Sequence, residues 1–237
     1  MTVAPAVELI GLTAAYGRIE VVHGIDLVVP SGSMFALLGP NGAGKTTTLK
    51  VIDGRHPAAS GCVHIAGHHL NGAGADAITR ARVCSIPEGR GIFPNLTVAE
   101  NLRVMNYRSL GLSDADLRER VFARFPILGE RRAQTAGTLS GGQQQMLAMS
   151  RAVATDPALL LIDELSMGLA PLVVIELYDA LGSLAADGMT VLLVEQFART
   201  ALAIADYAAV MAHGEIQAVG QPADLRDVGD AYLGVAS

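Results

Sequence analysis

Short apolar segments and amphipathic segments alternate along the chain, and the two kinds predict different elements. Residues 35–38, 159–162 and 190–194 are short, almost entirely apolar, and followed by glycine or an acidic residue. Such segments are typical of strands that are buried on both faces. Because all-apolar strands separated by helices form parallel sheets covered on both sides, the pattern predicts an α/β core.

The pattern changes in the middle of the chain, between roughly residues 95 and 157. Thr97 and Glu100 form a T-x-x-E capping box, which marks the start of a helix. Leu117, Val121 and Phe125 recur at four-residue spacing and predict the apolar face of a second helix. We therefore expect a helical lobe inserted into the α/β core.

Composition narrows the class of protein. The chain has 237 residues, of which 51% are hydrophobic, enough to fill the core of one large domain. Charged residues make up 17% and the formal net charge is -6, which weighs against a nucleic-acid binder.

Cys62 and Cys84 stand in no CxxC pattern, so a reducing compartment is expected. The N-terminal segment lacks the positive start of a signal peptide, and no run of about 18 to 20 apolar residues predicts a membrane span.

A glycine-rich loop follows the apolar segment at residues 35–38. Residues 39–46, GPNGAGKT, match the P-loop pattern GxxxxGK(S/T) between a predicted strand and a helix. Glycines let backbone N–H groups close around phosphate oxygens, and the helix N-terminus adds partial positive charge, so ATP binding is favoured over a plain turn. We expect Lys45 to meet the β- and γ-phosphates and Thr46 to offer its hydroxyl to Mg²⁺. The predicted ATP-binding residues of this segment are Gly39, Pro40, Asn41, Gly42, Ala43, Gly44, Lys45, Thr46 and Thr47.

Two carboxylates follow the apolar segment at residues 159–162. Ligands of parallel sheets bind at the carboxyl ends of the strands, so Asp163 and Glu164 are expected beside the phosphates. We assign Asp163 to the Mg²⁺ shell, and Glu164 to orienting or deprotonating the attacking water. An acidic pair alone would more often mark a helix start, but the P-loop favours the catalytic interpretation.

A second glycine-rich helix start occurs at residues 139–143, LSGGQ. Ser140 is a helix cap in this pattern, and Gly141, Gly142 and Gln143 form an N-terminus that suits an anion. Because the P-loop already has its own helix for the phosphates, we interpret this second start as facing the ATP of a neighbouring subunit. Without that context, a plain helix cap is the alternative.

The P-loop, LSGGQ and LLLIDE segments together resemble the ATP-binding cassette (ABC) family over nearly the whole chain. The resemblance implies an α/β P-loop NTPase (RecA-like) core with a small antiparallel β-subdomain and an inserted α-helical subdomain. It implies a single ABC ATPase domain, with the core and β-subdomain at residues 1–90 and 158–237 and the helical signature subdomain at 91–157. Two such cassettes would enclose two ATP molecules. Tyr16 falls where the family stacks an aromatic ring on adenine.

Finer features are similar to the LivF-type ATPase of branched-chain amino-acid importers. Residues 86–90, IPEGR, stand at the family's Q-loop, which makes Glu88 a candidate metal ligand where glutamine is usual. Residues 166–171, SMGLAP, stand at its D-loop. Gln196 occupies the position of the switch histidine.

Three residues depart from the family's pattern. Leu165 replaces the usual proline after the acidic pair, and Leu169 replaces the acidic residue of the general D-loop. Gln196 matters more, because glutamine cannot take up a proton as histidine can, although it can still hydrogen-bond a γ-phosphate or water. We hypothesise that the catalytic residues Lys45, Glu164 and Gln196 form a site that hydrolyses ATP more slowly than the partner's site.

The resemblance also implies partners and a location. The partners are a second ABC ATPase subunit, two membrane permease subunits and, indirectly, a solute-binding protein. The second ATPase subunit is expected to be a different chain, with a homodimer as the alternative. The location is the cytoplasmic face of the cell membrane. ATP and Mg²⁺ are the expected cofactors, and nucleic acid is not expected. The implied cargo is a branched-chain amino acid or a similar small polar solute such as urea or an amide. The alternatives are a soluble ABC ATPase acting on ribosomes or DNA, and a nucleotide-dependent assembly module with little hydrolysis.

Cys62, His64, His68 and His69 are residue types that bind zinc. Alternation places Cys62 and His64 on one strand face, but no matching second pair follows. Gly67 instead predicts a hairpin turn, so we expect no metal beyond Mg²⁺.

Overall fold

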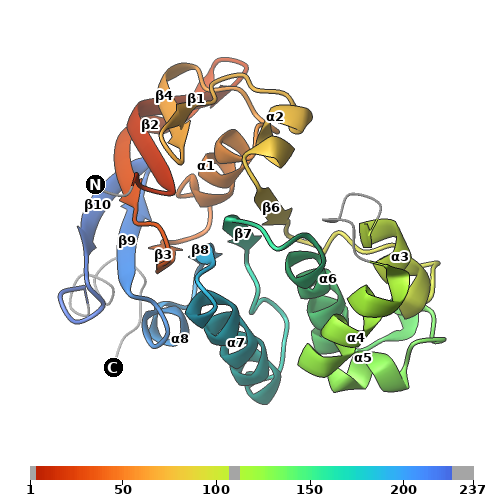
Figure 1. Cartoon of the computed structure of the whole chain (residues 1–237). Coiled ribbons are helices and arrows are strands. Elements are labelled where there is room, and N and C mark those ends of the chain that lie inside the picture. Colours follow the sequence, from red (N-terminus) through yellow and green to blue (C-terminus); the bar gives the residue numbers. More distant parts are fainter. Residues whose placement is uncertain (1–3, 107–112, 226–237) are drawn as a thin grey trace.

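Two sheets and a group of helices make up the protein (Figure 1). The computed structural model describes residues 4–106 and 113–225. The larger sheet has the strand order β10-β9-β3-β8-β7-β6. Its strands are β3 (Met34–Leu38), β6 (Val83–Ile86), β7 (Leu159–Asp163), β8 (Thr190–Glu195), β9 (Tyr207–Ala212) and β10 (Glu215–Gly220).

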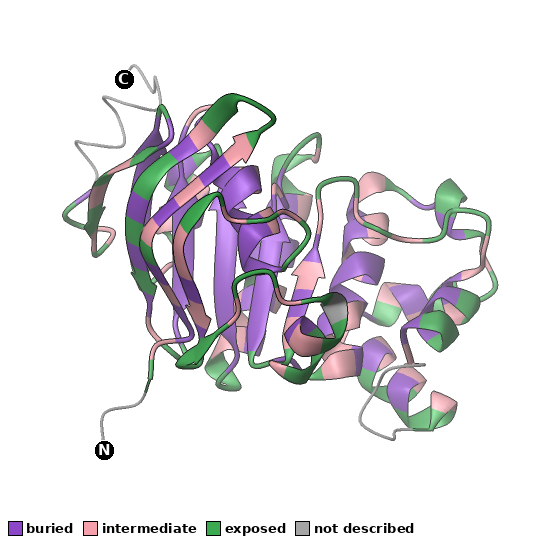
Figure 2. Ribbon diagram, turned by 90° about the horizontal axis from the view of Figure 1, so that it is seen from above, coloured by how far each residue is buried: buried purple, intermediate pink, exposed green. Residues whose placement is uncertain are grey.

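The three strands predicted from apolar segments are confirmed as β3, β8 and β7, which lie side by side and run parallel. Every residue of these three strands is buried, as the purple strands of Figure 2 show. One hydrophobic cluster covers one face of the sheet and includes Leu38, Ile162 and Leu193, and another covers the opposite face and includes Leu37 and Leu161. The expected α/β core with two covered faces is therefore present. The sequence did not predict β10, which pairs antiparallel with β9 at the edge.

The smaller sheet is antiparallel, with the order β2-β1-β4-β5. Its strands are β1 (Val7–Tyr16), β2 (Ile19–Val29), β4 (Ser60–Ile65) and β5 (His68–His69). The helix α1 (Lys45–Ile52) lies between the two sheets, because Leu49 and Ile52 belong to the hydrophobic cluster that both sheets share. Ala66 and Gly67 join β4 to β5 with positive φ values of 49° and 79°, so the predicted hairpin turn is confirmed.

The remaining helices surround the larger sheet or form a group at its β6 edge (Figure 1). In that group α3, α4 and α5 each contact α6, which in turn contacts α7. The helices are α2 (Ala75–Arg80), α3 (Val98–Asn106), α4 (Asp114–Arg124), α5 (Pro126–Glu130), α6 (Gly141–Thr155), α7 (Pro171–Ala186) and α8 (Ala198–Leu202), with a 3₁₀ turn at Ala136–Thr138. Within the described ranges, no helix combines the length and the apolar character that crossing a membrane requires.

Local signals in the helical group are confirmed with one correction. The Thr97 N–H and hydroxyl donate to the Glu100 carboxylate over 2.8 and 2.7 Å, and the Glu100 N–H donates back to the Thr97 hydroxyl, which completes the capping box. Leu117 and Val121 are buried on α4, as predicted. Phe125, however, lies one residue beyond the helix with φ −129° and ψ 76°, because Pro126 disfavours helical backbone at the residue before it. Its side chain is still buried.

Candidate nucleotide site

The P-loop connects the carboxyl end of β3 to the start of α1. Gly42 and Gly44 have φ values of 79° and 105°, a region that side chains other than glycine rarely enter. At Gly39 a Cβ would lie 2.1 Å from the backbone oxygen of Met211 on β9, so only glycine fits. These constraints explain why glycine stands at positions 39, 42 and 44 of the loop.

Lys45 is 3% exposed and folds back over its own loop. Its Nζ donates to the carbonyl oxygens of Gly39 at 2.8 Å and Pro40 at 3.0 Å. Burial lowers the pKa of Lys45, and the charges of Glu164 and Asp163 partly offset that effect. The carboxylates thus offset only part of the desolvation cost of the buried ammonium group, and a phosphate bound nearby would lower that cost further. A lysine that binds phosphate needs this property.

The two residues predicted to bind metal from the P-loop and from β7 are in contact. The Thr46 hydroxyl donates to Asp163 Oδ1 over 3.0 Å. Burial raises the pKa of Asp163, the bond from Thr46 opposes the shift, and the charges of Glu164 and Glu88 add to it. Hydroxyl and carboxylate oxygens are the donors that a hard divalent cation prefers, so this arrangement fits Mg²⁺.

Glu164 is half-buried and has a φ of 51°, a strained value for a residue with a side chain. Its N–H donates to the backbone oxygen of Val194 on β8 over 3.0 Å, which holds this turn against the neighbouring strand. Glu164, Glu88 and Gln145 are among the residues that line a cavity of about 350 Å³. The structure thus brings Glu88, which the resemblance places at the Q-loop, and the predicted catalytic carboxylate to one cavity.

Two further residues predicted for the site are exposed. Gln196 is exposed and directly follows β8, the strand beside both β3 and β7. Tyr16 is 46% exposed, and its ring lies against the His56 ring with centroids 4.4 Å apart. No motif in the sequence marks His56, because the pair forms only when β1 meets the segment that follows α1.

The signature residues begin α6, as predicted. The Ser140 hydroxyl accepts the Gln143 N–H at 3.3 Å, and the Gln143 side chain accepts the Ser140 N–H at 3.1 Å, so Ser140 is a true cap. A Cβ on Gly142 would lie 2.1 Å from a methyl group of Val173 on α7, and one on Gly141 would lie 2.9 Å from Leu169. The glycines therefore also allow α6 to approach α7 closely, a packing role that the motif alone does not indicate.

A buried carboxylate was missed. Glu195 ends β8, is 1% exposed, and accepts three hydrogen bonds from Ser166 and Tyr178. Its position after an apolar strand was visible in the sequence. The partners were not, because Ser166 and Tyr178 are 29 and 17 residues away.

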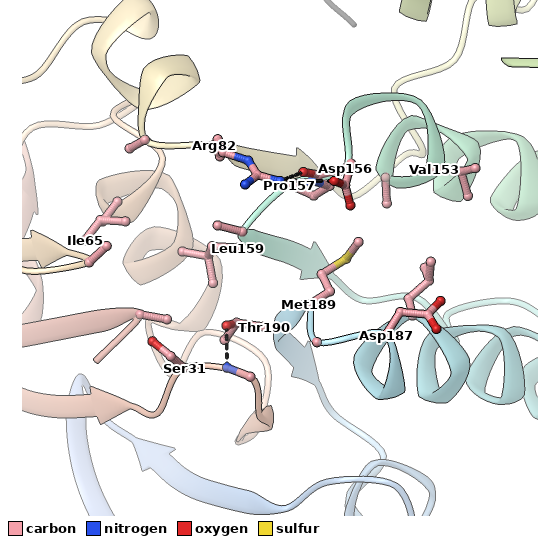
Figure 3. A pocket seen from close by; sticks show the side chains of 18 of the residues that line it. Ser31, Ile65, Arg82, Val153, Asp156, Pro157, Leu159, Asp187, Met189 and Thr190 are labelled. Atoms are coloured by element: carbon pink, nitrogen blue, oxygen red, sulfur yellow. Dashed lines mark hydrogen bonds and ion pairs between the residues drawn. The ribbon is translucent and has the colours of Figure 1, made fainter. Parts of the chain in front are cut away.

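A cavity of about 820 Å³ lies at the opposite edge of the sheet, where β7 and β8 begin (Figure 3). None of the residues assigned to ATP, Mg²⁺ or the signature lines it. Arg82 and Arg124 in its wall form ion pairs with Asp156 at 3.2 Å and Asp187 at 3.1 Å. Two of the arginines in its wall are thus paired with carboxylates, and the cavity does not include the P-loop.

The P-loop, the acidic pair at the end of β7 and the capped α6 define a P-loop ATPase of the cassette class. The family model described as ABC transporter matches residues 22–166, and the chain belongs to that family. The resemblance inferred from the motifs is therefore confirmed, as are the cassette fold and ATPase activity.

Three comparisons locate the chain within the family. It is 42% identical over 226 residues to the high-affinity branched-chain amino acid transport ATP-binding protein BraG of Pseudomonas aeruginosa, covering 92% of this chain and 95% of that protein. It is 33% identical to the probable branched-chain amino acid transport ATP-binding protein LivF of Archaeoglobus fulgidus, covering 90% and 91%. A solved structure of the ATP-binding subunit of an ABC transporter superposes with a TM-score of 0.82 at 30% identity, covering 100% of this chain and 96% of the other.

Proposed function

We propose that this chain hydrolyses ATP to energise an ABC importer, with a branched-chain amino acid or a similar small polar solute, such as urea or an amide, as cargo. The contact between Thr46 and Asp163 carries the catalytic part, since it joins the phosphate-binding helix to the acidic end of β7. The similarity to BraG over nearly the full length of both chains supports the cargo class.

We assign the residues of the site as follows. Tyr16 stacks on adenine, the backbone N–H groups of residues 39–47 bind the phosphates, and Lys45 neutralises the β- and γ-phosphates. Glu164 accepts the proton of the attacking water or orients that water. Gln196 hydrogen-bonds the γ-phosphate or the water without accepting a proton.

We assign Thr46, Asp163 and Glu88 to the Mg²⁺ ion. When bound, the ion neutralises developing charge on the phosphate oxygens. The Thr46 hydroxyl and the Asp163 carboxylate already meet, which supports their assignment. Glu88 lies close enough to raise the pKa of Asp163, which supports its place on the same edge.

The proposed assembly has two cassettes, two permease subunits and an associated solute-binding protein, at the cytoplasmic face of the membrane. Residues 140–143 serve the ATP of the other cassette, because the P-loop already supplies its own helix start for the phosphates of this chain's ATP. We further propose that residues 91–157 form the subdomain that carries this signature, and that residues 1–90 and 158–237 form the nucleotide-binding unit.

The test is ATP turnover of the assembled transporter with Glu164→Gln in this cassette, and separately with the equivalent change in the partner cassette. Because we propose that Gln196 slows this site, we expect Glu164→Gln here to remove the smaller share of turnover while ATP binding persists. Glu176→Gln is the matched control, since Glu176 is an exposed carboxylate on α7. It should leave turnover unchanged.

Two results would contradict parts of the proposal. If Glu164→Gln here abolishes turnover while the partner's change is tolerated, the slow-site hypothesis is wrong. If the wild-type cassette shows no ATP turnover with any combination of partners, the chain acts as a nucleotide-dependent assembly module instead.

A further inference from the structure

The buried Glu195 carboxylate has no role in the chemistry assigned above, yet it meets three donors. Its Oε1 accepts the Ser166 N–H at 2.9 Å and the Tyr178 hydroxyl at 3.0 Å, and its Oε2 accepts the Ser166 hydroxyl at 2.8 Å. A buried carboxyl group is costly to leave without hydrogen-bond partners. The three partners therefore stay together while Glu195 is in place.

The partners belong to three different segments. Glu195 ends β8, Ser166 begins the loop between β7 and α7, and Tyr178 lies in the middle of α7. Each of the first two lies within two residues of a residue of the catalytic set, because Gln196 follows Glu195 directly and Glu164 stands two residues before Ser166. The Glu195 carboxylate thus connects the loop after Glu164 to the end of β8, directly before Gln196.

A second contact holds the same region from the backbone side. The Glu164 N–H donates to the oxygen of Val194, the residue before Glu195. The turn at Glu164, with its strained φ of 51°, is consequently held against β8 by hydrogen bonds to two successive residues, Val194 and Glu195. A strained backbone persists only where its surroundings determine it, and these two contacts supply that constraint.

We propose that Glu195 is a positioning residue, which uses Ser166 and Tyr178 to hold the Glu164 turn and Gln196 in fixed relation for ATP hydrolysis. The inference rests on the roles proposed for Glu164 and Gln196. Tyr178 suits its part, because burial raises its pKa and keeps the hydroxyl protonated as a donor. The P-loop contacts of Lys45 and Thr46 do not pass through Glu195, so ATP affinity should not depend on it.

The experiment measures kcat and KM for ATP in the assembled transporter whose partner cassette carries the change equivalent to Glu164→Gln, so that the turnover measured comes from the site of this chain. Tyr178→Phe removes one donor and keeps the ring, and we expect kcat to fall about three- to tenfold with KM unchanged. Ser166→Ala should act in the same way, and Glu195→Ala should lower kcat by about 100-fold or more. Glu195→Gln keeps one accepting oxygen and should retain clearly more activity than Glu195→Ala.

The matched control is Thr190→Val at the other end of β8. Thr190 is also buried and accepts a backbone N–H, that of Gly32, at 2.9 Å. Its loss should lower the unfolding midpoint as much as Tyr178→Phe does, but leave kcat within about twofold. A kcat loss that merely follows stability across all variants would overturn the inference.

Two further outcomes separate the inference from the site assignment. If Glu164→Gln loses turnover while folded Tyr178→Phe and Ser166→Ala keep wild-type kcat, Glu195 is only structural and the inference alone is wrong. If Glu164→Gln keeps full turnover, the role assigned to Glu164 is wrong and the inference fails with it. If Glu195→Ala does not fold, Tyr178→Phe and Ser166→Ala still decide the outcome.

Discussion

The Thr46 hydroxyl donates a hydrogen bond to Asp163 across 117 residues of sequence, at a distance of 3.0 Å. The contact joins the first turn of α1 to the end of β7, although β8 lies between β7 and the strand that leads into the P-loop. Phosphate-binding and metal-binding groups therefore meet at one edge of the sheet.

Asp163→Asn should separate function from stability. Burial raises the pKa of Asp163, so the ionised carboxylate carries a desolvation cost at neutral pH that the amide avoids. With the partner cassette's site inactivated, we expect Mg²⁺-dependent ATP turnover to fall by about 100-fold or more, while the unfolding midpoint of this chain stays the same or rises. Asp187→Asn, at the opposite edge of the sheet, is the control and should keep full turnover. Normal turnover in Asp163→Asn would remove Asp163 from the metal site.

Gly142→Ala should loosen the packing of α6 on α7. Its new methyl group would meet Val173 at 2.1 Å, and such overpacking costs about 1–3 kcal/mol in the free energy of unfolding. Gly182→Ala is the matched control, because its methyl group meets nothing within 4 Å and its residue lies inside α7. It should stabilise the protein by about 0.5–1 kcal/mol. Denaturant titration of both variants measures the difference, and equal effects would contradict the packing role.

Cys84 should resist alkylation in the folded protein. Burial raises the pKa of its thiol, an effect that Arg151 only partly opposes, and the thiolate is the reactive form. In a Cys62→Ser background, we expect labelling of Cys84 to be at least about tenfold slower in buffer than in denaturant. The reverse background, Cys84→Ser, should label readily at the partly exposed Cys62. Equal rates for the two thiols would show that β6 opens in the native state.

Glu195 should give the stability a specific pH dependence. Because burial raises its pKa, the folded protein holds this proton more tightly than the unfolded chain does. That contribution is complete below the unfolded pKa and is lost as pH rises through the folded value. Glu195→Gln cannot titrate, so its stability relative to wild type should increase as pH rises above the range in which an unfolded glutamate titrates and through the raised folded pKa. Unfolding free energies of both proteins at several pH values provide the measurement, and a constant difference would contradict the raised pKa.

Local chemistry made much of the site predictable. A P-loop needs glycines, a lysine and a hydroxyl at consecutive positions, because the backbone of one short segment must surround the phosphates. Capping boxes are also local, so Thr97 and Ser140 could be recognised from residues three positions away. The β10 strand and the non-helical backbone of Phe125 were not predictable from local patterns. The first depends on pairing with β9, and the second on the proline that follows.

The sequence by itself determined the buried strands, the phosphate loop and the acidic pair, because each requirement is met within a few contiguous residues. Only the tertiary structure decided that Thr46 meets Asp163, that Gly142 faces Val173, and that Glu195 binds Ser166 and Tyr178. Those contacts depend on the strand order of the sheet and on how closely α6 approaches α7. Composition and spacing do not specify them, because residues far apart in the chain become neighbours only when the core packs.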